Sequence, residues 1–184
     1  MGTGQTMLTL AAMVLLSFLI LRVNNLFLQT TTTLNTTKFD VLAFSLAQSM
    51  IQEIEGNAFD NNTVSAVITA TSGLSTTLGP ESGETYGTYN DIDDYDNFTR
   101  TDTVPKNSGV VFYTKCIVDY VTSAAPDVAT STPTWNKRIT VYVTSPFMIQ
   151  NSLTNQYYKK VTSTTSIIQD TVKLSQVFSY WNFK

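Results

Sequence analysis

The 184-residue sequence contains no histidine and only one cysteine. Without histidine there is no His-based catalytic triad, no histidine metal ligand and no use of the most common general base. The lone Cys116 excludes an intrachain disulfide, and its place in the apolar run "VVFYTKCIVDYV" predicts a small buried side chain. No nucleophile elbow and no S-x-x-K motif is present, so we expect that the protein is not an enzyme.

Charge is also sparse. Charged residues make up 14% of the sequence, the net charge is -3 and the pI is about 4.8. An average soluble domain is about one quarter charged. No basic face is visible, which argues against nucleic acid as a partner. Threonine, with 31 copies, is the dominant polar residue. Such a surface suits an extracellular or polymer-facing protein.

Residues 7–21 form a nearly unbroken apolar run, and no basic residue precedes it. A secretory signal peptide would begin with a basic region and end at a small-x-small cleavage site, and both cues are missing. A transmembrane helix fits better, although fifteen residues span only about 23 Å of a roughly 30 Å hydrocarbon core. The third interpretation is a helix that lies first in lipid and later in the core of a polymer of identical copies.

A second apolar segment, "FDVLAFSLAQSMIQEIE", repeats its apolar residues at steps of three and four, which predicts an amphipathic helix. Val41, Phe44 and Ile51 are expected to lie off the main stripe, so a second face of this helix also needs cover. Gly56 is the expected helix end. The intervening Thr/Asn-rich stretch predicts a loosened or broken turn within residues 22–37, and "TKFD" resembles a weak capping box for a fresh helix start.

The remainder is expected to be a β-rich head. Residues 57–109 are expected to form loops with short elements, and Pro126, Pro133 and the stretch over 146–160 mark connections. Alternating apolar residues predict strands over 109–121, 137–145 and 170–181. The predicted fold class is therefore α+β: a long N-terminal helix, apolar in its first half and amphipathic in its second, packed on a mainly antiparallel sheet. We expect two parts, a helix over 1–56 and a globular head over 57–184.

An apolar N-terminal helix, an amphipathic second half and a β-rich head together resemble a type IV pilin or pilin-like subunit. The resemblance implies a filament subunit whose N terminus contacts a neighbouring copy. If Met1 is the mature end, Gln5 stands where the family usually carries a glutamate, and it brings a hydrogen-bonding group without a charge. The glycine and proline that often unwind the family's helix are missing from this sequence.

On this basis the protein is expected to be a structural subunit of an extracellular type IV pilus-like filament. Its partners would be identical copies, and, before assembly, the cytoplasmic membrane and the pilus assembly machinery. Two alternatives stay open: a pseudopilin of a type II-like secretion machine, and a membrane-anchored adhesin or binding module. Eight apolar residues are expected to pack helix against helix in the filament core: Leu8, Leu10, Met13, Val14, Leu16, Phe18, Leu19 and Ile20.

The segment "YNDIDDYDNF" concentrates four carboxylates within six residues, namely Asp91, Asp93, Asp94 and Asp96. Such a cluster would suit Ca²⁺, which takes six to eight oxygen ligands, but the EF-hand register is absent. A solvated acidic turn is the alternative, and the run also resembles a segment in minor pilins of the mannose-sensitive haemagglutinin type. No other cofactor is expected.

Three N-glycosylation sequons begin at Asn35, Asn61 and Asn97, although such triplets are frequent by chance in a chain rich in Thr and Asn. The terminal "FSYWNF" is either a sticky aromatic patch or the end of a core strand, in which case Phe178 and Tyr180 would be buried.

Overall fold

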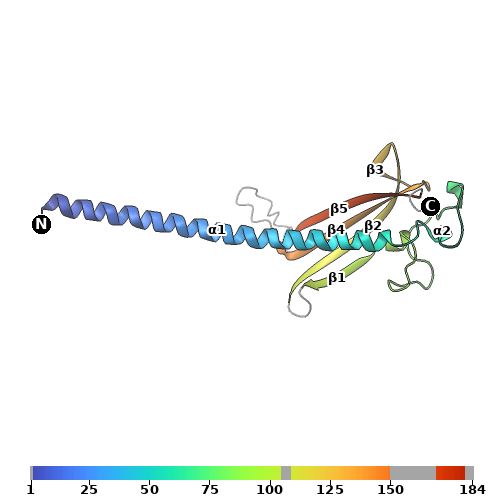
Figure 1. The fold of residues 1–184 in the computed structure, drawn as a ribbon, viewed down its shortest axis with the longest axis horizontal. Coiled ribbons are helices and arrows are strands. Elements are labelled where there is room, and N and C mark those ends of the chain that lie inside the picture. The colour runs from blue at the N-terminus through green and yellow to red at the C-terminus, as the bar shows by residue number, and fades with distance from the viewer. Residues whose placement is uncertain (1, 105–108, 150–168, 181–184) are drawn as a thin grey trace, which may run out of the picture. The chain divides into compact units, whose positions relative to one another are not determined.

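The computed structural model describes residues 2–104, 109–149 and 169–180, and it shows an α+β fold (Figure 1). The chain forms two compact units, Met1–Phe39 and Asp40–Lys184. The first consists of the first part of helix α1 (Thr3–Glu55), and the second contains the rest of that helix and all other elements. The sequence predicted a boundary after residue 56, just beyond the end of α1. The two compact units instead meet inside α1, between Phe39 and Asp40.

Helix α1 is continuous for 53 residues, so the predicted break within residues 22–37 and the fresh start at "TKFD" are wrong. Threonine hydroxyls explain the continuity. Those of Thr30, Thr31, Thr33 and Thr37 lie 2.9–3.0 Å from the carbonyl oxygen four residues earlier. Each hydroxyl is therefore satisfied within the helix and does not offer its backbone an alternative partner. Glu55 is the last helical residue, which confirms the expected end at Gly56.

The amphipathic second half of α1 is confirmed. Ala43, Ala47, Met50 and Ile54 are fully buried, whereas Val41 and Phe44 are 61% and 51% exposed. Ile51 was expected to lie off the stripe but is also fully buried. It follows Ala47 by four residues and precedes Ile54 by three, which places it on the same face.

Within the described residues the sheet has five strands: β1 (Thr99–Val104), β2 (Val110–Thr122), β3 (Ala125–Thr130), β4 (Asn136–Ile149) and β5 (Gln169–Ser179). Its order is β1-β2-β4-β5, with β3 also pairing with β2, and all neighbours are antiparallel. The strands lie alongside the second half of α1 in Figure 1. Hydrogen bonds join the two layers, since Arg100 of β1 bonds Glu53 and Gln176 of β5 bonds Glu55.

The three predicted strands are confirmed as β2, β4 and β5, while β1 and β3 were not predicted. Ile139, Val141 and Val143 are fully buried and so face the core as expected. Pro126 was taken for a connection but lies within β3, where it is tolerated because this short strand pairs with β2 alone. The expected connection over 146–160 begins inside β4, and its remainder lies outside the described residues.

The segment between α1 and β1 carries three short elements: α2 (Asn61–Ser65) and the 3₁₀ turns η1 (Thr71–Gly73) and η2 (Asp93–Tyr95). Asp60 caps α2 in a capping box with Thr63. Phe59, Leu74, Ile92 and Tyr95 are buried, so this segment contributes to the core although it contains little regular structure. A parallel bridge between Ala58 and Asp91 holds its two ends together.

Candidate functional site

The first half of α1 presents an uncovered apolar surface. Sixteen large apolar side chains between Met7 and Leu34 are exposed, and the structure shows no buried residue among the described side chains of 2–38. The eight residues predicted to form a self-assembly core all belong to this set and are 57–74% exposed. An apolar surface of this kind requires a partner surface or lipid around it.

This apolar surface is also longer than the fifteen-residue run over 7–21 expected from the sequence. The segment Thr3–Thr31, 29 residues, is long and apolar enough to cross a membrane. At 1.5 Å per residue it spans about 43 Å, more than the roughly 30 Å hydrocarbon core. The estimate of a fifteen-residue run too short for a bilayer is therefore wrong, because the helix continues through Arg22 without a break.

The expected N-terminal contact is only partly described. Gln5 is exposed, and its backbone N–H donates to the carbonyl oxygen of Gly2 at 2.9 Å. Its side chain projects from the first turn of α1, where a neighbouring molecule can reach it. Met1 lies outside the described residues.

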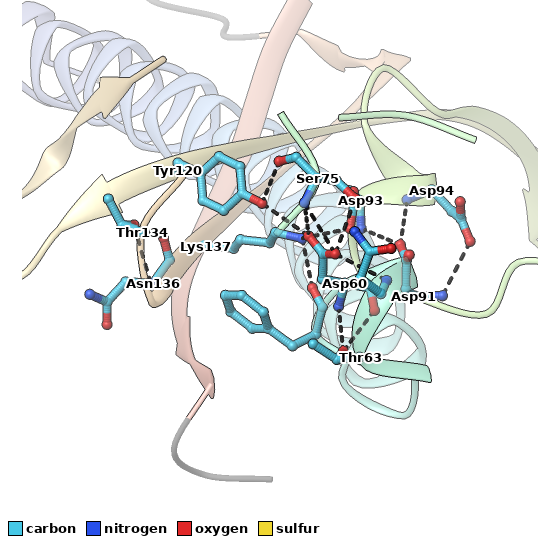
Figure 2. A network of polar contacts seen from close by, with 12 residues as sticks. Asp60, Thr63, Ser75, Asp91, Asp93, Asp94, Tyr120, Thr134, Asn136 and Lys137 are labelled. Atoms are coloured by element: carbon cyan, nitrogen blue, oxygen red, sulfur yellow. Dashed lines mark hydrogen bonds and ion pairs between the residues drawn. The ribbon is translucent and has the colours of Figure 1, made fainter. Parts of the chain in front are cut away.

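The second unit contains a buried polar network centred on Lys137 (Figure 2). The Lys137 side chain is fully buried, and its Nζ lies 2.6 Å from Asp93 Oδ1, 3.0 Å from Asp60 Oδ2 and 2.7 Å from the Phe59 carbonyl oxygen. The rings of Phe59 and Tyr120 flank the ammonium group at 4.7 and 5.1 Å. This single cation therefore joins β4 to the N-cap of α2 and to η2.

Asp60 is the second centre of the network. Its carboxylate also accepts hydrogen bonds from the backbone N–H and the hydroxyl of Ser75, and the Tyr120 hydroxyl lies 3.0 Å from Oδ2. Burial alone would raise the pKa of Asp60, but the Lys137 ammonium and these donors outweigh it and lower the pKa. Asp60 is thus held as a carboxylate.

The four carboxylates proposed as Ca²⁺ ligands separate into different roles. Asp93 pairs with Lys137, and Asp96 accepts from the backbone N–H of Val118 at 3.0 Å. Asp91 accepts from the backbone of η2 at 2.9 and 3.2 Å. Asp94 accepts from the backbone N–H groups of residues 90 and 91. Asp91, Asp93 and Asp94 are buried, so the alternative of a solvated acidic turn describes only the half-buried Asp96.

Asp91 is the least favourably placed of these carboxylates. It is fully buried, its Oδ2 has no hydrogen-bond partner, and it forms no ion pair with any described residue. Burial, a hydrogen bond with Asp93 and the charges of Asp93 and Asp94 raise its pKa to about 9. Asp91 is consequently protonated at neutral pH.

The two glutamates in the last turn of α1 have partners that offset their unfavourable position at the negative end of the helix dipole. Glu53 Oε2 lies 3.2 Å from Arg100 Nη1, and its Oε1 accepts from the Tyr86 hydroxyl at 2.6 Å. Glu55 accepts from Gln176 at 2.6 Å. The helix end is thereby attached to β1, β5 and the loop before η2.

The sequons differ in accessibility. Asn97 and Thr99 are exposed, and Asn97 has a φ of 57°, in the left-handed region. Asn61 is half-buried, and the hydroxyl of Thr63, which completes its sequon, is part of the α2 capping box. The side chain of Asn35 lies outside the described residues. Of the two sequons whose asparagine side chain is described, that of Asn97 is therefore the better placed for modification.

The remaining predicted residues belong to the core. Cys116 is fully buried, and burial raises the pKa of its thiol to about 12. Phe178 and Tyr180 are 7% and 8% exposed, and the Tyr180 ring stacks on Trp135. Cys116 is thus the small buried side chain that the sequence predicted, and Phe178 and Tyr180 belong to the end of a core strand.

Lys137 was not among the predicted site residues, although the alternation of β4 indicates that its side chain is buried. Period-two alternation places position 137 on the same face as Ile139 and Val141, both fully buried. A basic residue on a core face requires buried carboxylates opposite it. Residues 57–99 supply these carboxylates and contain no basic residue of their own.

Comparison of the chain with protein-family models, with curated proteins and with solved structures finds no match.

Proposed function

We propose that this chain is a structural subunit of an extracellular type IV pilus-like filament that polymerises through its N-terminal apolar helix. The observation that carries the proposal is the surface of α1 over residues 7–34, where every large apolar side chain is exposed within the chain itself. The α+β fold, a long helix followed by a head with an antiparallel sheet, is compatible with a pilin-like subunit.

The free energy of this apolar surface depends on whether water, lipid or a neighbouring helix covers it. Each large apolar side chain left in water forfeits about 1.5–3 kcal/mol relative to burial, so sixteen of them exclude a free, water-exposed helix. Lipid covers such a helix before assembly. In the filament, helices of identical copies cover one another, and close packing provides contacts that fluid lipid does not.

A second surface supports contacts between copies. Val41 and Phe44 remain exposed on α1, outside the stripe of the buried Ala43, Ala47 and Met50. The head covers only one face of this part of the helix. A neighbouring copy that covers the other face makes a heterologous contact, and repetition of such a contact builds an open helical polymer.

A membrane-anchored binding module is the second candidate. It is favoured by the membrane-spanning length of Thr3–Thr31. In that case the helix stays in lipid and the head acts alone. A pseudopilin would share the fold and the polymer contacts but form only short assemblies. We propose no catalytic role for any of the three.

Microscopy of the native cell surface tests the proposal. Material sheared from producing cells is examined by negative-stain electron microscopy, with an antibody raised against the second unit as label. The proposal expects long filaments labelled along their whole length. Label confined to detergent-extracted membranes would support the anchored module instead, and sparse short stubs would support a pseudopilin. Mass spectrometry of the mature chain from the same material defines its N terminus.

A further inference from the structure

A second group of carboxylates lies beside the Lys137 network and is joined to it only through Asp94, which exchanges hydrogen bonds with Asp91 (Figure 2). Glu81 and Glu84 belong to the loop before η2, and Asp94 belongs to η2 itself. One carboxylate oxygen from each of the three lies within 4.8 Å of the others. Because two ligands on one Ca²⁺ ion at 2.3–2.6 Å stand at most about 5 Å apart, a single ion can reach all three oxygens.

The loop geometry holds the two glutamates in place. The backbone N–H of Glu81 donates to Glu84 Oε2 at 3.1 Å, and the N–H of Glu84 donates to the Glu81 carbonyl oxygen at 3.1 Å. Gly83, between them, has a φ of 95°, which closes the turn. Glu84 Oε1 also accepts from the Asn90 side-chain amide at 2.8 Å. The turn therefore presents both carboxylates toward Asp94.

Asp94 provides an independent indication of a ligand. Its side chain is fully buried, and its Oδ2 accepts from the backbone N–H groups of Asn90 and Asp91 at 2.8 and 3.2 Å. Its Oδ1 is buried without any hydrogen-bond partner. Glu81 Oε2 and Asn90 Oδ1 are likewise buried and unpartnered. Buried acceptors without donors are costly, and a cation is the partner that satisfies several oxygens at once.

No positive charge compensates these carboxylates within the described residues. The ion pairs of Lys137 go to Asp60 and Asp93, and those of Arg100 go to Glu53 and Asp102. The three carboxylates therefore have no countercharge in the described part of the chain.

We propose that Glu81, Glu84 and Asp94 form a Ca²⁺ site that fastens the loop before η2 to the core of the head. All donors are oxygens, the preference of hard divalent cations, and the irregular loop geometry suits Ca²⁺ better than the strict octahedron of Mg²⁺. The site uses only Asp94 from the acidic run 91–96. It differs in this respect from the four-aspartate site expected from the sequence.

Terbium luminescence tests the site on the full chain in detergent micelles. Tb³⁺ replaces Ca²⁺ at oxygen sites and is sensitised by nearby tyrosine. Tyr89 stands between Glu84 and Asn90 in this loop, and its ring packs against that of Tyr95, the residue after Asp94. At pH 8 we expect tyrosine-sensitised emission that Ca²⁺ displaces at lower concentration than Mg²⁺. Absence of sensitised emission, or equal displacement by both ions, would overturn the proposal.

Matched variants assign the ligands. Glu81→Gln and Glu84→Gln keep the size of each side chain and are expected to weaken Ca²⁺ binding at least about tenfold. The control is Asp127→Asn in β3, an exposed carboxylate of a distant strand, for which affinity should not change. Thermal unfolding in EDTA verifies that the variants fold. Addition of Ca²⁺ should then raise the Tm of the wild type and of Asp127→Asn, but not that of Glu81→Gln or Glu84→Gln. Unchanged affinity in these folded variants would contradict the assignment.

Discussion

Lys137 Nζ lies 2.6 Å from Asp93 Oδ1, and both side chains are inaccessible to solvent. The same ammonium pairs with Asp60, so one lysine on β4 neutralises two buried carboxylates of the segment before β1. Desolvation offsets much of the Coulomb attraction in such a pair, but removal of one partner leaves an uncompensated buried charge. The head therefore depends on Lys137 more strongly than on any exposed ion pair.

Lys137→Met is accordingly expected to destabilise the head by about 3–5 kcal/mol, because it leaves Asp60 and Asp93 without their cation. Urea unfolding of the detergent-solubilised chain, followed by intrinsic fluorescence, measures the change. The matched control is Lys115→Met on neighbouring β2, where the side chain is exposed and the expected change is within about 0.5 kcal/mol. Equal losses in both variants would show that the network contributes nothing beyond an ordinary surface charge.

The pH dependence of stability should reveal the protonated state of Asp91. Its pKa is raised to about 9 in the folded head but is about 3.9 in an unfolded chain, so the folded state binds more protons between these values. Stability must then fall as pH rises through this range. Glu81, with its pKa raised to about 7, and Asp94, whose pKa burial also raises, act in the same sense, so a variant is needed to assign the slope to Asp91.

Asp91→Asn tests this interpretation, because an amide keeps the oxygen that accepts from the η2 backbone and removes the titration. We expect the variant to be a few degrees more stable than the wild type at pH 8.5, with a flatter decline in Tm above pH 7.5. Measurements in EDTA exclude effects of metal ions. A wild-type Tm that stays constant between pH 7.5 and 9 would contradict the raised pKa.

The sequence was sufficient for the fold class because the relevant patterns are local. Steps of three and four in the second half of α1 and the alternation in β2, β4 and β5 identify helix and strands without knowledge of their partners. Strand β1, "TRTDTV", has no apolar alternation. It lies at the edge of the sheet, and its extended conformation is stabilised by backbone pairing with β2. Only the three-dimensional pairing identifies such a strand.

The polar clusters were harder to predict for the same reason. Asp91, Asp93, Asp94 and Asp96 look equivalent in sequence, yet each meets a different group: the η2 backbone, Lys137, the Glu81 loop or β2. Proximity in sequence thus does not mean convergence on one ligand. The threonine-rich stretch misled in the opposite way, because a low helix propensity is only a weak preference and these hydroxyls find acceptors in the preceding turn of the helix.

Removal of residues 1–39 should give a soluble, folded monomer. All large core residues of the head belong to the unit Asp40–Lys184, and the described side chains of residues 2–38 contribute no buried residue. Analytical ultracentrifugation without detergent checks the oligomeric state, and circular dichroism checks the fold. A truncated chain that aggregates, or that still assembles into filaments, would show that the apolar half of α1 is not what makes the full chain associate.

Exchange of two apolar residues separates packing in a polymer from residence in lipid. Leu16 and Phe18 are 57% and 62% exposed in the chain, and the double variant Leu16→Phe with Phe18→Leu has an unchanged composition. Transfer into lipid depends on the sum of apolar groups and should not change, whereas contacts between close-packed helices depend on shape. We therefore expect the variant to enter membranes like the wild type but to yield fewer filaments, or filaments that melt at lower temperature. Quantitative immunoblots of the membrane and sheared fractions, with microscopy of the latter, provide the comparison. If filament yield and melting are the same as for the wild type, these two side chains do not pack in a filament core, and their place is in lipid.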